Sequence, residues 1–69
     1  MAMIDDVRKL IERLAPNPVC DECIAERLSL AEAAASLTTH ELAGTSLFER
    51  RRAPCALCGA EKLAIRRLP

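Results

Sequence analysis

Apolar residues recur at intervals of three and four along the first fifteen positions of the chain, at Met3, Val7, Leu10, Ile11 and Leu14. This spacing places them on one face of an amphipathic helix. Asp5 and Asp6 suit the positive N-terminal end of such a helix, and Pro16 and Pro18 end it. The pattern therefore predicts a first helix over residues 4–15 that packs a small core.

A second helical pattern follows the prolines and includes two cysteines. Cys20, Cys23, Ile24 and Leu28 stand at positions i, i+3, i+4 and i+8, so they share one face of a helix. We expect the two sulfur atoms to point inward from the start of this second helix.

An alanine-rich segment supplies the third predicted helix. Ser29 is a candidate N-cap, and Glu32 three residues later completes a capping box. The helix runs to about Ala43, where Gly44 can end it. We expect its apolar side to consist of Leu30, Ala33, Ala34 and Leu37.

The pattern changes from Leu47 onward. The runs LFERR and KLAIRR bracket a loop of Pro, Cys and Gly, which predicts a β-hairpin with Cys55 and Cys58 near its tip. A helix over residues 61–68 is the alternative, because Leu, Ala, Lys and Arg all favour helix. Together these elements predict an α+β fold, with three helices and a two-stranded hairpin in a single domain over residues 1–69.

Composition limits how well such a fold can stabilise itself. Of the 69 residues 51% are apolar, but twelve are alanine and Phe48 is the only aromatic residue. A domain of this length hides only about 60% of the surface that its unfolded chain exposes. A core this small usually needs a metal, disulfides or a partner chain to hold it together.

The four cysteines form two CxxC pairs, which are the strongest chemical signal in the chain. Between the pair Cys20 and Cys23 and the pair Cys55 and Cys58 stand 31 residues. Each pair can chelate through two thiolates, and two pairs complete a tetrahedron, so we predict one structural zinc ion. Iron accepts the same ligands, and the sequence leaves zinc against iron open. The segment CALCG is typical of a zinc knuckle, in which the glycine lets the backbone aim amides at the sulfurs.

Other uses of the cysteines fit the sequence less well. A thioredoxin-like redox pair follows a βαβ pattern, which is missing here, and two disulfides need an oxidising compartment. The N-terminus has Asp5 and Asp6 where a secretory signal has lysines and an apolar run, and no uncharged apolar stretch approaches about 18 residues. We therefore expect a cytoplasmic protein with no membrane partner.

Candidate catalytic groups are few. A site of four thiolates leaves no open coordination position for a substrate. The chain has no Ser/His/Asp set and no phosphate-binding glycine loop, and His40 fits a helix-surface or cap residue better than a fifth ligand. We expect no enzymatic activity.

Basic residues are concentrated in the C-terminal third of the chain. The formal net charge is zero, but from Leu47 onward six bases face two acids, giving +4. These bases are the candidates for contact with nucleic-acid phosphates: Arg50, Arg51, Arg52, Lys62, Arg66 and Arg67. Alternation along a strand sends neighbouring arginines to opposite faces, so we expect only some of them to reach one duplex. Solvated charge on a small hairpin is the alternative.

The order of a helix, a CxxC-led helix, a turn, a helix and an Arg-rich hairpin resembles a helix-turn-helix with a wing. CDECIAERL followed by FERRRAPCALCGAEKLAI resembles a family of small bacterial proteins with a zinc-bound, winged-helix-like domain, over residues 20–66. The resemblance implies zinc on Cys20, Cys23, Cys55 and Cys58, and DNA binding by analogy with winged helices. The segment SLAEAAASLTTHELA, in the place of a recognition helix, contains no Arg, Lys, Asn or Gln to read base edges.

The sequence therefore predicts a non-enzymatic module with one structural zinc ion. Its first predicted role is nucleic-acid binding or another transcription-related function. The alternative is a protein-interaction or adaptor module without DNA binding, which self-associates or binds a partner through the alanine-rich third helix.

Overall fold

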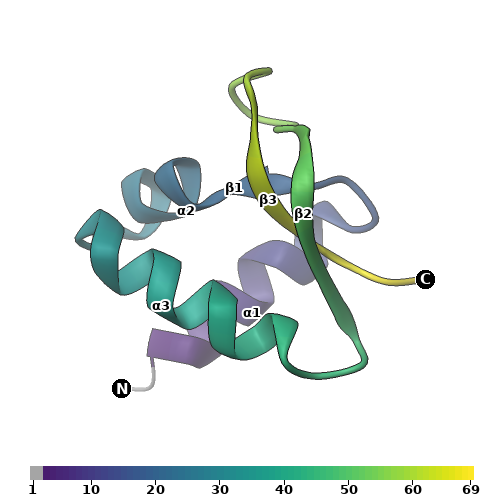
Figure 1. Cartoon of the computed structure of the whole chain (residues 1–69). Helices are drawn as coiled ribbons and strands as arrows, with labels where there is room; N and C mark the ends of the chain where they lie inside the picture. The colour runs from purple at the N-terminus through teal and green to yellow at the C-terminus, as the bar shows by residue number, and fades with distance from the viewer. Residues whose placement is uncertain (1–2) are drawn as a thin grey trace.

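The structure is a computed structural model that describes residues 3–69, and for these residues it has an α+β fold of three helices and three strands (Figure 1). The elements in chain order are α1 Met3–Leu14, β1 Val19–Cys20, α2 Asp21–Leu28, α3 Glu32–Ala43, β2 Phe48–Pro54 and β3 Glu61–Arg67. The predicted fold class is confirmed at this level. Among the described residues, no helix has both the length and the apolar character needed to cross a bilayer.

The sheet is antiparallel, with strand order β1-β3-β2. The pairs between β2 and β3 run from Phe48 opposite Arg67 to Pro54 opposite Glu61, so the predicted hairpin is present and residues 61–67 form a strand. The expected two-stranded sheet is corrected to three strands, because Val19 and Cys20 pair with Ile65 and Ala64. Two residues are too few for an alternating pattern, which is why the sequence did not show β1.

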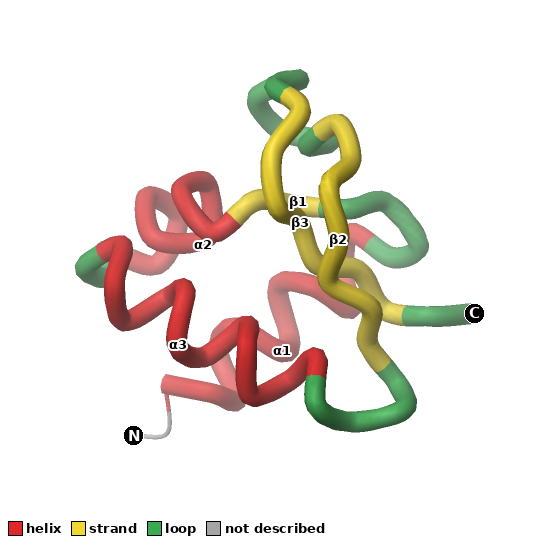
Figure 2. Tube along the Cα trace, viewed as in Figure 1, coloured by secondary structure: helices red, strands yellow, loops and turns green. Residues whose placement is uncertain are grey.

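The core lies between the helices and one face of the sheet. Figure 2 shows the three helices on one side of the sheet, with the tip of the β2–β3 hairpin projecting beyond them. Val7 and Ile11 of α1 are fully buried, as the helical spacing predicted, and they share the core with Ile24 and Ile65. Phe48 closes the core from β2 and is 5% exposed.

The predicted capping box at the start of the third helix is wrong. Ser29 is the C-cap of α2, with a left-handed φ of 55°, and its amide bonds back to the carbonyls of Ala25 and Glu26. The N-cap of α3 is Ala31, which has no side-chain cap hydrogen bond. A serine that ends one helix cannot also adopt the extended conformation with which an N-cap begins the next.

The predicted apolar face of the third helix is wrong in part, although Leu30 packs against the core and Ala34 is half-buried. Leu37 is 68% exposed and Ala33 is exposed, while Ala35, Thr39 and Leu42 are buried. Alanines stand on several sides of this helix, so its apolar residues do not define a direction. The helix does end at Ala43 with Gly44 as its C-cap, as predicted.

Candidate metal centre

The four cysteine sulfurs lie together, although they come from two segments far apart in the chain. All four Sγ atoms lie within 4.8 Å of one another. The two closest pairs join different segments, with Cys20 Sγ 3.9 Å from Cys58 Sγ and Cys23 Sγ 3.7 Å from Cys55 Sγ. A tetrahedral zinc ion with Zn–S bonds of about 2.3 Å places its sulfurs about 3.8 Å apart. The cluster therefore has the dimensions needed to hold one tetrahedral metal ion.

Each cysteine is placed by a defined turn or cap. Cys20 ends β1 and is the N-cap of α2, which brings Cys23 into the first turn of that helix. Cys55 follows β2 directly, and its carbonyl accepts a hydrogen bond of 2.8 Å from the amide of Gly59. Gly59 has a φ of 78°, a conformation that favours glycine and turns the chain back into β3. This turn holds Cys58 beside the sulfurs of α2.

Backbone amides point at one of the sulfurs. Cys55 Sγ accepts hydrogen bonds from the amides of Cys20, at 3.3 Å, and Leu57, at 3.4 Å. Burial raises the pKa of the Cys55 thiol, but the amides of Cys20, Cys58 and Leu57 outweigh burial and lower the pKa to about 6. Cys55 is therefore prepared as a thiolate, the form that binds metal.

The pKa values of the thiols of Cys20 and Cys23 are raised, in contrast to that of Cys55. Burial raises the pKa of the Cys20 thiol, and burial together with the neighbouring cysteines raises the pKa of Cys23. Four thiolates cannot be packed this closely without a cation, because each repels the others. A bound dication would supply that charge, so the four sulfurs can act together as thiolates around a metal ion such as zinc.

A lysine stands beside the cluster. Lys62 forms an ion pair with Glu22, and this carboxylate raises the pKa of the lysine, with smaller contributions from Cys20 and Cys58. Its ammonium group thus lies where it can offset part of the negative charge of the thiolates. Lys62 was predicted as a phosphate contact, and the structure places it near the four-cysteine cluster.

Arg50 lies inside the domain and does not project into solvent. Its guanidinium donates to Asp21 Oδ2 at 2.6 Å, and the two side chains are only 16% and 12% exposed. The other oxygen of Asp21 accepts a hydrogen bond of 2.7 Å from the Thr39 hydroxyl. Asp21 therefore links β2, α2 and α3, and the Nε atom of Arg50 is left buried without a hydrogen-bond partner.

The remaining arginines predicted to contact phosphate differ in whether another side chain of the protein already pairs with them. Arg51 and Arg66 both form ion pairs with Glu49. Arg67 lies near Glu12 and over the ring of Phe48. Arg52 is exposed, and among residues 3–69 it has no hydrogen-bond or ion-pair partner. The structure therefore spreads the six cations over both faces of the hairpin, as strand alternation predicted.

His40 is exposed on α3 and does not belong to the four-cysteine cluster. The sequence interpretation missed Asp21 and Thr39, which form the polar link between the helices. Their signal is weak, since an aspartate at a helix start is usually a solvated charge and a threonine within a helix usually bonds to its own backbone.

Comparison of the chain with protein-family models, with curated proteins and with solved structures returned no match.

Proposed function

We propose that this chain is a non-enzymatic module in which one zinc ion fixes a hairpin against a helix pair for binding to nucleic acid. The observation that carries the proposal is the position of the cysteine cluster. It joins the first turn of α2 to the tip of the β2–β3 hairpin, so a bound metal holds the hairpin at a fixed place relative to α2 and α3. Four protein thiolates leave a zinc ion no free coordination position, which favours a structural role over catalysis.

The arrangement of elements supports a winged-helix assignment. Only residues 29–31 separate α2 from α3, a turn of the length found in helix-turn-helix motifs. The hairpin follows α3 in the position of a wing. Fold alone does not establish DNA binding, so the proposal depends on side chains that can reach phosphate.

Arg52 is the best placed of these side chains. Phe48, Arg50 and Arg52 alternate along β2 and so share one face of the hairpin. Phe48 reaches the core and Arg50 reaches α2, whereas Arg52 lies nearer the projecting tip and is exposed without a carboxylate partner. It is therefore free to neutralise a phosphate beside α3, at no cost in broken ion pairs.

The test is fluorescence anisotropy of a labelled DNA duplex with the zinc-loaded protein, repeated over a series of salt concentrations. We expect weak, salt-sensitive binding, and Arg52→Ala should reduce the slope of log K against log salt by about 1, the value for one phosphate contact. Lys9→Ala, which removes an exposed cation from α1, is the matched control and should leave the slope unchanged. Arg50 is left intact, because its loss would disturb the fold. Absence of binding at low salt, or an equal effect of both variants, contradicts the proposal.

A second candidate function is protein interaction through α3. The observation that favours it is the exposed side of this helix, where Leu37 is 68% exposed between Glu32 and Glu41, two carboxylates that repel phosphate. If α3 mediates self-association, sedimentation velocity will show a mass that rises with concentration, and Leu37→Glu will return the protein to a monomer. A constant monomer mass in the unmodified protein contradicts self-association.

A further inference from the structure

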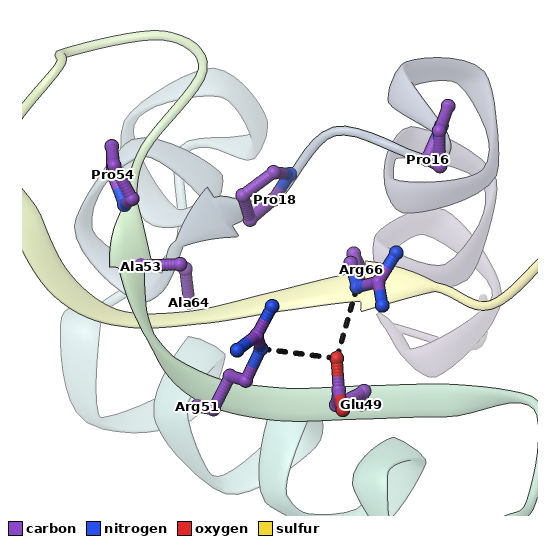
Figure 3. A pocket seen from close by; sticks show the side chains of 8 residues that line it. All are labelled: Pro16, Pro18, Glu49, Arg51, Ala53, Pro54, Ala64 and Arg66. Atoms are coloured by element: carbon purple, nitrogen blue, oxygen red, sulfur yellow. Dashed lines mark hydrogen bonds and ion pairs between the residues drawn. The ribbon is translucent and has the colours of Figure 1, made fainter.

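The outer face of the sheet, opposite the helices, contains a hollow of about 250 Å³ (Figure 3). Its floor is formed by two small side chains, Ala53 of β2 and Ala64 of β3. Pro18 and Pro54 stand at its sides. The hollow exists because alanines occupy the outward positions of two neighbouring strands, where a larger residue would fill the space. Its apolar part offers room for an aliphatic or prolyl side chain.

We call this hollow the outer groove. One of its ends carries two cations, which share one anion. Arg66 Nε donates to Glu49 Oε1 at 2.9 Å, and Arg51 Nε lies 3.2 Å from the same oxygen (Figure 3). The hydrogen bond from Arg66 lowers the pKa of Glu49, which is therefore ionised at neutral pH. Two guanidinium groups and one carboxylate leave a net charge of +1 at this end.

The terminal nitrogens of these two arginines are available for a ligand. Within the described part of the chain, neither Arg51 nor Arg66 donates a hydrogen bond from its Nη atoms. Arg51 is 64% exposed and can turn toward a ligand, while Arg66 is 27% exposed and is held by Glu49. A planar guanidinium binds a carboxylate through two parallel hydrogen bonds, which gives a second carboxylate a defined place here.

We propose that the outer groove binds an extended peptide segment of a partner protein, in which a carboxylate side chain stands next to an aliphatic or prolyl residue. The carboxylate pairs with Arg51 and Arg66, and the apolar side chain lies on Ala53 and Ala64. This site goes beyond the proposed nucleic-acid function, since it faces away from α3 and does not involve Arg52. The apolar floor and proline sides favour a peptide over a nucleic-acid backbone, which would leave its sugars and phosphates against surface that cannot hydrogen-bond to them.

The test uses ¹⁵N-labelled, zinc-loaded protein and the blocked tetrapeptide acetyl-Leu-Glu-Pro-Leu-amide, followed by two-dimensional NMR. We expect saturable shifts of the amides of residues 49–53 and 64–66 at millimolar peptide. The Gln analogue of the peptide should bind about fivefold more weakly, as expected for the loss of one partly exposed charge pair.

Matched variants separate the groove from the rest of the hairpin. Arg51→Gln removes one cation of the groove, and Ala53→Val fills its floor, so each should weaken the peptide shifts. Arg52→Gln changes the neighbouring arginine on the other face of β2 and should leave peptide binding intact. The DNA test depends on Arg52 and the peptide test on Arg51, so either proposal can fail alone.

Four outcomes overturn the proposal of a peptide site. They are the absence of shifts at millimolar peptide, equal binding of the Glu and Gln peptides, and binding that survives Arg51→Gln and Ala53→Val together. The fourth is a shift of the same amides on dilution of the protein alone, or displacement of the bound peptide by duplex DNA, which would identify a second copy or nucleic acid as the occupant. Preservation of the remaining amide spectrum in each variant shows that the fold is intact.

Discussion

Asp21 and Glu22 are neighbouring carboxylates in the first turn of α2, and they differ mainly in burial. Asp21 is 12% exposed and pairs with Arg50, whereas Glu22 is 56% exposed and pairs with Lys62. Asp21→Asn leaves the Arg50 guanidinium buried without its counter-charge, a change that costs about 3–5 kcal/mol. Glu22→Gln removes the same charge from the same helix end but leaves its lysine in solvent.

The expected loss is large for a chain of 69 residues. A domain of this length has a free energy of unfolding of about 3–10 kcal/mol. A loss of 3 kcal/mol lowers Tm by about 12 °C or more, because each kcal/mol corresponds to about 4–8 °C in a domain of this size. The Asp21→Asn variant should therefore be partly unfolded near 37 °C. The Tm of the Glu22→Gln variant should stay close to that of the unmodified protein.

The assay is urea and thermal unfolding followed by far-UV circular dichroism, with all proteins in excess zinc so that metal occupancy is constant. The combined variant Asp21→Leu and Arg50→Met removes both charges and should recover most of the lost stability, because no buried charge is left unpaired. A loss of less than about 1 kcal/mol in Asp21→Asn would show that the Asp21–Arg50 ion pair does not stabilise the packing of β2 on the helices.

Two further predictions concern single features of the fold. Ser29→Gly should raise the free energy of unfolding by about 1 kcal/mol in urea titrations, because Ser29 has a left-handed φ of 55° that glycine adopts without strain; a destabilised variant would contradict this. Acidification should release the metal, because burial raises the pKa of Cys20 and Cys23 and protons then compete with zinc for these thiolates. Stability from zinc is therefore present at neutral pH and lost as the pH falls, which cobalt-substituted protein will report as loss of its thiolate absorption; an absorption that persists in acid would oppose this assignment.

Local periodicity and turn chemistry explain which parts of this fold were predictable. The face of α1, the CxxC helix and the hairpin each have a signal within a few residues, such as the spacing of Val7 and Ile11 or the glycine after Cys58. The matched spacing of the cysteines likewise predicted a cluster, which the structure assembles from α2 and the hairpin.

The features that the sequence did not reveal depend on tertiary contacts. The buried face of α3 is selected by Asp21 and by the packing of α1, so Thr39 turns inward while Leu37 remains exposed. The strand β1 exists only because β3 offers an edge for Val19 and Cys20. In the sequence, Arg50 is one of three consecutive arginines and resembles a surface residue. Its side chain contacts Asp21 because the strand register places Arg50 opposite the buried Ile65.

In the proposed structure, one metal ion on four thiolates holds the hairpin against α2. The most direct measurement is native mass spectrometry with elemental analysis of the purified protein, followed by thermal unfolding before and after chelation. We expect one zinc ion per chain and loss of the folded spectrum on chelation, with recovery when zinc is returned, because metal binding contributes on the order of 10 kcal/mol in small domains. A metal-free protein with four titratable thiols and unchanged unfolding would contradict it.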